Sequence, residues 1–94
     1  MVTFKLINTS AKPISTIIVD YPSATFGKDK LAPGETFTSP VKLTDDGALK
    51  VHFTDANGSN HSYTGPMLHR NEGGSIVISF EQTTATVDTS KVKH

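Results

Sequence analysis

The chain has 94 residues, no cysteine, and nine basic against nine acidic residues, which gives a formal net charge of zero. A chain of this length makes one small domain with a single core, and balanced charge gives no basic surface for nucleic acid or an anionic membrane. The lack of cysteine excludes disulfides, thiol nucleophiles and thiolate metal sites, and no apolar run is long enough for membrane insertion.

Alternating apolar residues predict two strands at the beginning of the chain. Residues 2–7 alternate between apolar and polar side chains, which is the period of a half-buried strand. Residues 14–21 form a second strand, which ends at Pro22 because proline has no N–H to donate to a sheet. Ile17 and Val19 share one face of this strand and Ile18 lies on the other.

The next segment is more polar and contains two prolines. Residues 23–30 are predicted as a polar connection in which Phe26 packs at the core edge, and residues 31–35 as a turn. Residues 36–43 carry apolar side chains around Pro40. Because proline is largely confined to the edges of sheets, we expect an edge strand or a crossing between sheets there.

The strongest local signal lies between residues 48 and 66. Apolar and polar residues alternate over residues 49–54 and are followed by Asn57 and Gly58. Asn-Gly between extended segments favours a two-residue type I′ turn, in which both central residues take positive φ. The sequence therefore predicts a β-hairpin with a return strand over residues 60–64.

The last part of the chain contains one further strong strand. Residues 65–74 are predicted as a long loop and residues 75–81 as a strand with alternating apolar residues. Residues 82–94 are threonine-rich, which predicts either a weak edge strand near residues 83–88 or a flexible tail. The domain is expected to span residues 1–81.

About seven short strands separated by turns, without a segment of helical period, predict an all-β protein. A single small antiparallel β-sandwich matches this pattern. The same pattern permits a small β-barrel, which is the alternative.

Four short motifs lie within residues 4–80. They are Asn8-x-Ser10, Ile18-Val19-x-Tyr21, Leu31-Ala32-Pro33-Gly34-Glu35 and Gly47-x-Leu49-x-Val51-x-Phe53-x-Asp55-x-x-Gly58. Together they resemble the small immunoglobulin- or fibronectin-like sandwich modules of bacterial envelope proteins. The resemblance implies an immunoglobulin-like architecture and a module that spaces, scaffolds or binds, but fold alone does not transfer a specific function.

The two-residue turn also fixes which hairpin residues face one another. It places Thr54 opposite His61 and His52 opposite Tyr63, so that His52, His61 and Tyr63 share one face. These three residues form the candidate ligand-binding surface, because neighbouring imidazoles are ligands for zinc and copper. No third metal ligand is placed, so we assign no metal and no cofactor. The structural alternative is a solvated face on which Tyr63 stacks on His52.

No catalytic pattern is found in the sequence. It contains no G-x-S-x-G elbow, no H-E-x-x-H motif and no glycine loop leading into a helix. The adjacent carboxylates of Asp45 and Asp46 diverge on extended backbone. We therefore predict that the chain is not an enzyme, and assign no catalytic residue.

The sequence alone leaves the function unknown and favours a non-enzymatic interaction or scaffold module. Such a module would act through edge strands or surface loops, on a protein partner or on a second copy in a homodimer. The alternative is a small-ligand or metal-binding domain that uses the His52/His61/Tyr63 face. Serine-, threonine- and asparagine-rich composition with 19% charged residues favours a bacterial periplasmic or extracellular domain, whereas a native start at Met1 favours the cytoplasm.

Overall fold

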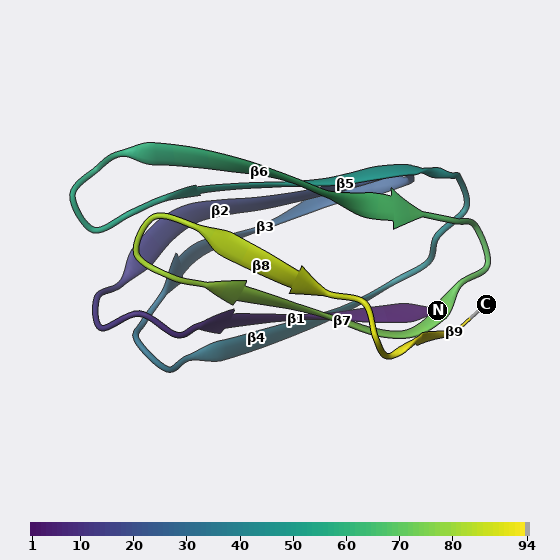
Figure 1. Cartoon of the computed structure of the whole chain (residues 1–94), viewed down its shortest axis with the longest axis horizontal. Helices are drawn as coiled ribbons and strands as arrows, with labels where there is room; N and C mark the ends of the chain where they lie inside the picture. Colours follow the sequence, from purple (N-terminus) through teal and green to yellow (C-terminus); the bar gives the residue numbers. More distant parts are fainter. Residues whose placement is uncertain (94) are drawn as a thin grey trace.

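The computed structural model describes residues 1–93, in which nine β-strands and no helix occur. Accordingly, no helix in this part of the chain is long and apolar enough to cross a membrane. The strands run along the long axis of the molecule, and the turns gather at its two ends (Figure 1). They are β1 (Val2–Asn8), β2 (Ile14–Tyr21), β3 (Ala24–Leu31), β4 (Thr36–Val41), β5 (Gly47–Thr54), β6 (Asn60–Leu68), β7 (Gly73–Phe80), β8 (Ala85–Asp88) and β9 (Val92–Lys93).

The strands form two sheets that pack face to face (Figure 1). The first sheet has the order β4-β1-β7-β8, with β9 also paired to β7, and the second has the order β3-β2-β5-β6. β1 and β7 are parallel, whereas the other strand pairs of residues 1–93 are antiparallel. This architecture confirms the predicted small β-sandwich, with nine strands instead of about seven. The alternative of a closed barrel is wrong.

One hydrophobic core fills the space between the sheets, because every second side chain of the central strands points inward. The buried residues of β1, β5 and β7 are Val2, Phe4, Leu6, Leu49, Val51, Phe53, Ile76, Ile78 and Phe80. Phe53 of the second sheet meets Phe80 of the first edge to face, with ring centroids 5.2 Å apart. Such contacts add to the stabilisation from apolar burial. The alternation that predicts these strands therefore also builds the core.

A β-bulge in β2 changes which residues face the core. The register between β2 and β5 shifts between Ser15 and Ile18, and Thr16 has a φ of 50°, a left-handed value that is rare for a β-branched residue. Because the bulge inserts one residue, Ile14 and Ile17 are both buried although they are three positions apart. Ile18 then lies on the outer face, as predicted, and is 37% exposed.

Residues 23–30 do not form the predicted connection, because the edge strand β3 lies there and pairs with β2. The prediction is wrong because β3 has few apolar side chains, a composition that edge strands share with loops. Phe26 packs against the rings of Phe4, Tyr21 and Phe37, with centroids 5.5, 6.1 and 6.5 Å apart. It thereby closes the core at this edge.

The tight turn between β5 and β6 has three residues, 56–58, between the closing pair Asp55 and Ser59, whereas two turn residues are predicted. Asp55 N donates to Ser59 O over 2.9 Å, and Gly58 N donates to Asp55 O over 3.0 Å. Gly58 has a φ of 85°, whereas Asn57 is not among the residues with positive φ. These features define a type I turn followed by a left-handed glycine. The predicted type I′ turn, which requires positive φ at Asn57, is therefore wrong.

The third loop residue moves the pairing of β5 and β6 by one position. Phe53 pairs with His61 and His52 pairs with Ser62, whereas the predicted turn pairs His52 with Tyr63. A slip of one residue turns every side chain of a strand to the other face of the sheet. The predicted pairing is therefore wrong along the whole return strand.

The remaining segments lie mostly at sheet edges. β6 continues to Leu68 and β7 begins at Gly73, so the predicted loop over residues 65–74 is wrong except for the turn between these strands. β4 and β8 are the two edges of the first sheet, which confirms the predicted edge strands. The segment predicted as an edge strand or flexible tail carries β8 and β9 up to residue 93, and residue 94 lies outside the described residues.

Candidate functional site

The structure separates the three residues of the predicted ligand-binding face. His52 lies on the outer face of the second sheet, and its Nδ1 is 3.1 Å from Ser62 Oγ. His61 lies on the inner side with Phe53, and their ring centroids are 5.1 Å apart. Tyr63 follows two residues after His61, so its side chain is also on the inner side of this edge strand, where it is 36% exposed. The three side chains do not share one face, so the geometric basis of the predicted site is wrong.

The two histidines of the hairpin have different neighbours, which bear on catalysis and metal binding. Ser62 and His52 have the spacing of a nucleophile and its base, but such a base is normally oriented by a third group. Within residues 1–93, the histidine at hydrogen-bond distance from a carboxylate is His61, which lies on the other face. No group of three histidine, aspartate or glutamate side chains in this part of the chain could hold a metal ion.

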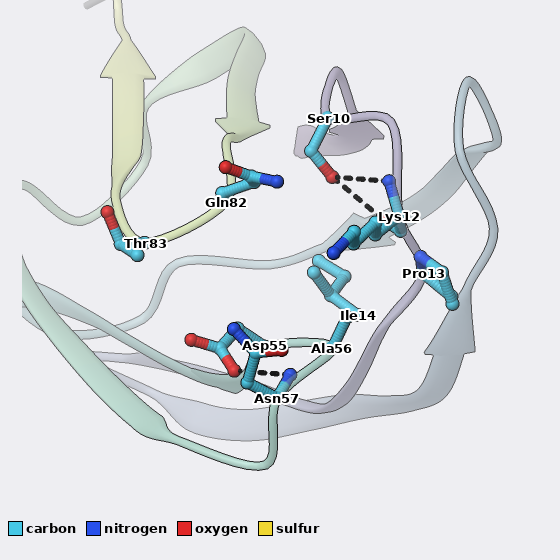
Figure 2. A pocket seen from close by; sticks show the side chains of 9 residues that line it. All are labelled: Ser10, Lys12, Pro13, Ile14, Asp55, Ala56, Asn57, Gln82 and Thr83. Atoms are coloured by element: carbon cyan, nitrogen blue, oxygen red, sulfur yellow. Dashed lines mark hydrogen bonds between the residues drawn. The ribbon is translucent and has the colours of Figure 1, made fainter.

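Three loops meet at one end of the sandwich and form the best candidate site (Figure 1). They are residues 9–13 between β1 and β2, residues 55–59 between β5 and β6, and residues 81–84 between β7 and β8. We call this region the loop end. A hollow of about 60 Å³ lies between the loops. Figure 2 shows Ser10, Lys12, Pro13, Ile14, Asp55, Ala56, Asn57, Gln82 and Thr83 around it.

The side chain of Asn8, which is fully buried, fixes the first loop. Its Nδ2 donates to the carbonyl oxygens of Lys12 and Leu31, each over 2.9 Å. Its Oδ1 accepts hydrogen bonds from Ser10 N and Ser10 Oγ, over 2.9 and 2.7 Å. Thr9 donates from both N and Oγ1 to Phe80 O, each over 2.9 Å, which joins this loop to the end of β7. The first loop is therefore held from both sheets.

The carboxylate of Asp55 fixes the second loop. Its Oδ1 accepts hydrogen bonds from Asn57 N at 2.8 Å and Ser59 N at 3.1 Å, and its Oδ2 lies 2.6 Å from His61 Nε2. The side chain of Asp55 is 8% exposed and that of His61 24%. The hydrogen bond from His61, followed by those from Ser59 and Asn57, holds the pKa of Asp55 below its ordinary value of 3.8. Asp55 is therefore an ionised anchor of the loop.

Several polar side chains around the hollow are not used by the fold. Lys12 and Gln82 extend toward the space between the loops (Figure 2). Within residues 1–93, the side chains of Lys12, Asn57, Gln82 and Thr83 make no hydrogen bond or ion pair, although the backbone of Lys12 and Asn57 is held by Asn8 and Asp55. One ammonium group, two amides and a hydroxyl are thus free to bind a partner. The volume of this hollow is far below the roughly 300–1,000 Å³ of small-molecule pockets, and a broader, more open hollow of about 590 Å³ adjoins it at Ser10, Gln82 and Thr83.

The loop end is not recognisable as a site from the sequence alone. Lys12, Asn57 and Gln82 are far apart along the chain, and the fold alone brings them together. The sequence carries only a weak signal for it, because each of the three loops is polar and follows an apolar strand.

Comparison with known proteins supports the fold and leaves the function open. No protein-family model and no curated protein matches the chain. A protein from Eubacterium rectale, solved by NMR, has a similar structure with a TM-score of 0.66 and 15% sequence identity. The match covers 95% of this chain and 87% of that one. At this identity the likeness concerns the fold alone.

Proposed function

We propose that this domain is a non-enzymatic binding module that recognises a protein partner through the loop end. The observation that carries the proposal is the set of free side chains, from Lys12, Asn57, Gln82 and Thr83, around one hollow. Loops that a rigid scaffold holds in place are frequent binding surfaces, and the loops of a sandwich cluster at its two ends.

Preorganised loops favour binding because less conformational entropy is lost when a partner docks. Asn8 and Asp55 hold two of the three loops through side-chain hydrogen bonds. In the third loop, Glu81 N donates to Thr84 O over 2.8 Å. The free side chains are thus presented from an ordered backbone, while their own ends stay available to a partner.

The edge strands are less favourable for partner binding, because each has a feature that opposes strand addition. β4 contains Pro40, and β6 contains Pro66 next to a register irregularity. β3 carries the charged residues 28–30, and β8 has four residues. These features support binding through the loops over the edge-strand homodimer that the sequence also predicts.

We also propose that the domain is immunoglobulin-like and of bacterial origin. The two packed sheets and the fold shared with a protein from Eubacterium rectale, which is a bacterium, support this proposal.

A charge reversal at the loop end tests the proposed function. Lys12→Glu changes a side chain at the hollow, and Lys42→Glu makes the same change in an exposed residue directly after Val41, which pairs with Val2 at the other end of β1 from the loop end. Each variant and the wild type are immobilised, and the proteins they retain from an extract of the producing cells are compared. We expect a partner that the wild type and Lys42→Glu retain and Lys12→Glu loses. A partner retained equally by Lys12→Glu, or lost equally by both variants, would place binding elsewhere.

A further inference from the structure

A second hollow, of about 250 Å³, lies on the outer face of the second sheet over β2, β5 and β6. One side of it is formed by Ile18, His52 and Ser62, which are aligned across the three strands by the sheet register. Thr54 and Asn60, which pair with each other, form the other side. The side chains between these two rows point to the inner face, so the hollow opens onto the backbone of β5 and β6.

The β-bulge of β2 places a residue with a strained backbone, Thr16, beside this hollow. Thr16 is exposed, lines the hollow and has a φ of 50°. Glycine would adopt this conformation without the clash that a Cβ causes, so threonine lowers the stability of the folded state here. Residues held in such conformations cluster at functional sites. The strain at Thr16 therefore points to a use for its hydroxyl at the hollow.

Most residues that line the hollow carry uncharged polar groups or imidazoles and none is aspartate, glutamate, lysine or arginine, whereas most of the lining surface itself is apolar. Both sides of the hollow are preorganised by side-chain contacts. Thr54 Oγ1 donates to Asn60 Oδ1 over 2.8 Å on one side, and His52 Nδ1 lies 3.1 Å from Ser62 Oγ on the other. Within the described part of the chain, the Asn60 amide nitrogen, His52 Nε2 and the Thr16 hydroxyl have no hydrogen-bond partner. Apolar surface is added by Ile18, which is 37% exposed.

We propose that this hollow binds a short stretch of a neutral saccharide. A pyranose ring has an apolar C–H face, which would pack on Ile18 and the imidazole of His52, and a rim of hydroxyls. Those hydroxyls would bond the free groups of Thr16, His52 and Asn60. A charged ligand would lose its hydration without a counter-charge from the lining, which disfavours it. This site is separate from the loop end and does not depend on the partner proposed there.

Titration of the ¹⁵N-labelled protein by NMR tests the proposal. The probes are neutral oligosaccharides of glucose, mannose, xylose and N-acetylglucosamine, with an uncharged Gly/Ser/Gln peptide as the competing ligand class. We expect one saccharide to shift the amides of residues 16–18, 52–54 and 60–62 in a saturable manner, and to leave residues 81–84 unchanged. No saturable shift with any saccharide, or saturation with the peptide alone, would overturn the proposal.

Variants of Thr16 separate binding from folding. Thr16→Gly removes both the strain and the hydroxyl, so we expect a higher melting temperature and affinity about tenfold weaker, the scale of one lost hydrogen bond. Thr16→Ser keeps the hydroxyl and should keep wild-type affinity. Thr38→Ala, in an exposed threonine of β4 in the other sheet, is the matched control and should leave affinity unchanged. Wild-type affinity in Thr16→Gly would contradict the assignment.

Discussion

His61 Nε2 lies 2.6 Å from Asp55 Oδ2, and this contact joins the inner side of β6 to the loop that borders the hollow at the loop end. The contact depends on the three-residue turn, because only the observed register places His61 beside Phe53 and under the loop. A slip of one residue would turn the imidazole to the outer face and leave the Asp55 carboxylate without it. The register of the hairpin therefore also determines the order of the loop end.

Asp55 should stabilise the domain in a pH-dependent manner. Its pKa is lower in the folded chain than its ordinary value of 3.8, first because of the hydrogen bond from His61 and then because of those from Ser59 and Asn57. A lowered folded pKa contributes stability above the unfolded pKa, and that contribution is lost as the pH falls through the folded pKa. We expect Asp55→Asn to lower the free energy of unfolding at neutral pH. This loss of stability should become smaller below pH 3.8.

Urea unfolding of the wild type and Asp55→Asn across this pH range measures the effect. Asp29→Asn changes an exposed aspartate of β3 and serves as the control, for which we expect a small change at every pH. If Asp55→Asn lowers the free energy of unfolding by the same amount at neutral pH and below pH 3.8, the Asp55 carboxylate is not stabilised by these hydrogen bonds.

Asn8 should be among the most sensitive polar positions of the fold. Asn8→Ala removes two hydrogen bonds to carbonyl oxygens and two from Ser10, at a fully buried site. We expect a loss of about 2–3 kcal/mol in the free energy of unfolding, because buried polar groups would lose their partners. Ser10→Ala, which removes only the hydroxyl bonds of a neighbouring residue, should cost less than about 1 kcal/mol. Equal losses in urea unfolding would contradict the central role of Asn8.

Gly74 should tolerate a side chain less well than Gly58, although both have a left-handed backbone. The φ values of Gly74 and Gly58 are 89° and 85°, so an alanine at either position costs about 1–2 kcal/mol in backbone strain. A Cβ at Gly74 would also collide with the carbonyl oxygen of Lys91, whereas one at Gly58 meets no atom within 4 Å. Chemical denaturation should show a clearly larger loss for Gly74→Ala, together with release of β9 from β7. Equal losses would contradict the pairing of β9.

The parts of the fold that follow from the sequence are those in which one face of a strand is buried. Val2, Phe4 and Leu6 in β1, like the apolar residues of β5 and β7, are buried at every second position. This period is visible in the sequence and predicts an all-β protein, but it permits a small barrel as well as the sandwich. β3 is not predicted from the sequence, because an edge strand needs few apolar residues and Phe26 alone does not establish an alternation of apolar and polar residues.

The candidate sites could not be predicted from the sequence, because they depend on register and topology. Asn57-Gly58 is compatible with a two-residue turn and with a type I turn followed by a left-handed glycine. The two turns differ by one residue, and this difference decides whether His61 joins His52 or Asp55. Lys12 and Gln82 come together only because β1 and β7 are neighbours in the first sheet.

Pro40 should protect the domain against self-association. It pairs with Thr3 at the edge of the first sheet and has no N–H, so it interrupts the row of donors that a second chain would use. Pro40→Thr supplies that donor together with a residue that favours strands. In sedimentation velocity we expect the wild type to remain monomeric as the protein concentration rises, and the variant to form dimers. Association of the wild type itself would favour the edge-strand homodimer.

The most direct measurement locates the partner on the surface of the domain. A photo-crosslinking residue, p-benzoylphenylalanine, is placed at Asn57 in the hollow and, in a matched variant, at Lys42 at the opposite end, where β4 ends beside the start of β1. Both variants are irradiated in an extract of the producing cells, and the covalent products are identified by mass spectrometry. If the domain binds through the loop end, one specific protein is crosslinked at position 57 and not at position 42. The same products at both positions, or specific crosslinking at position 42 alone, would contradict this mode of binding.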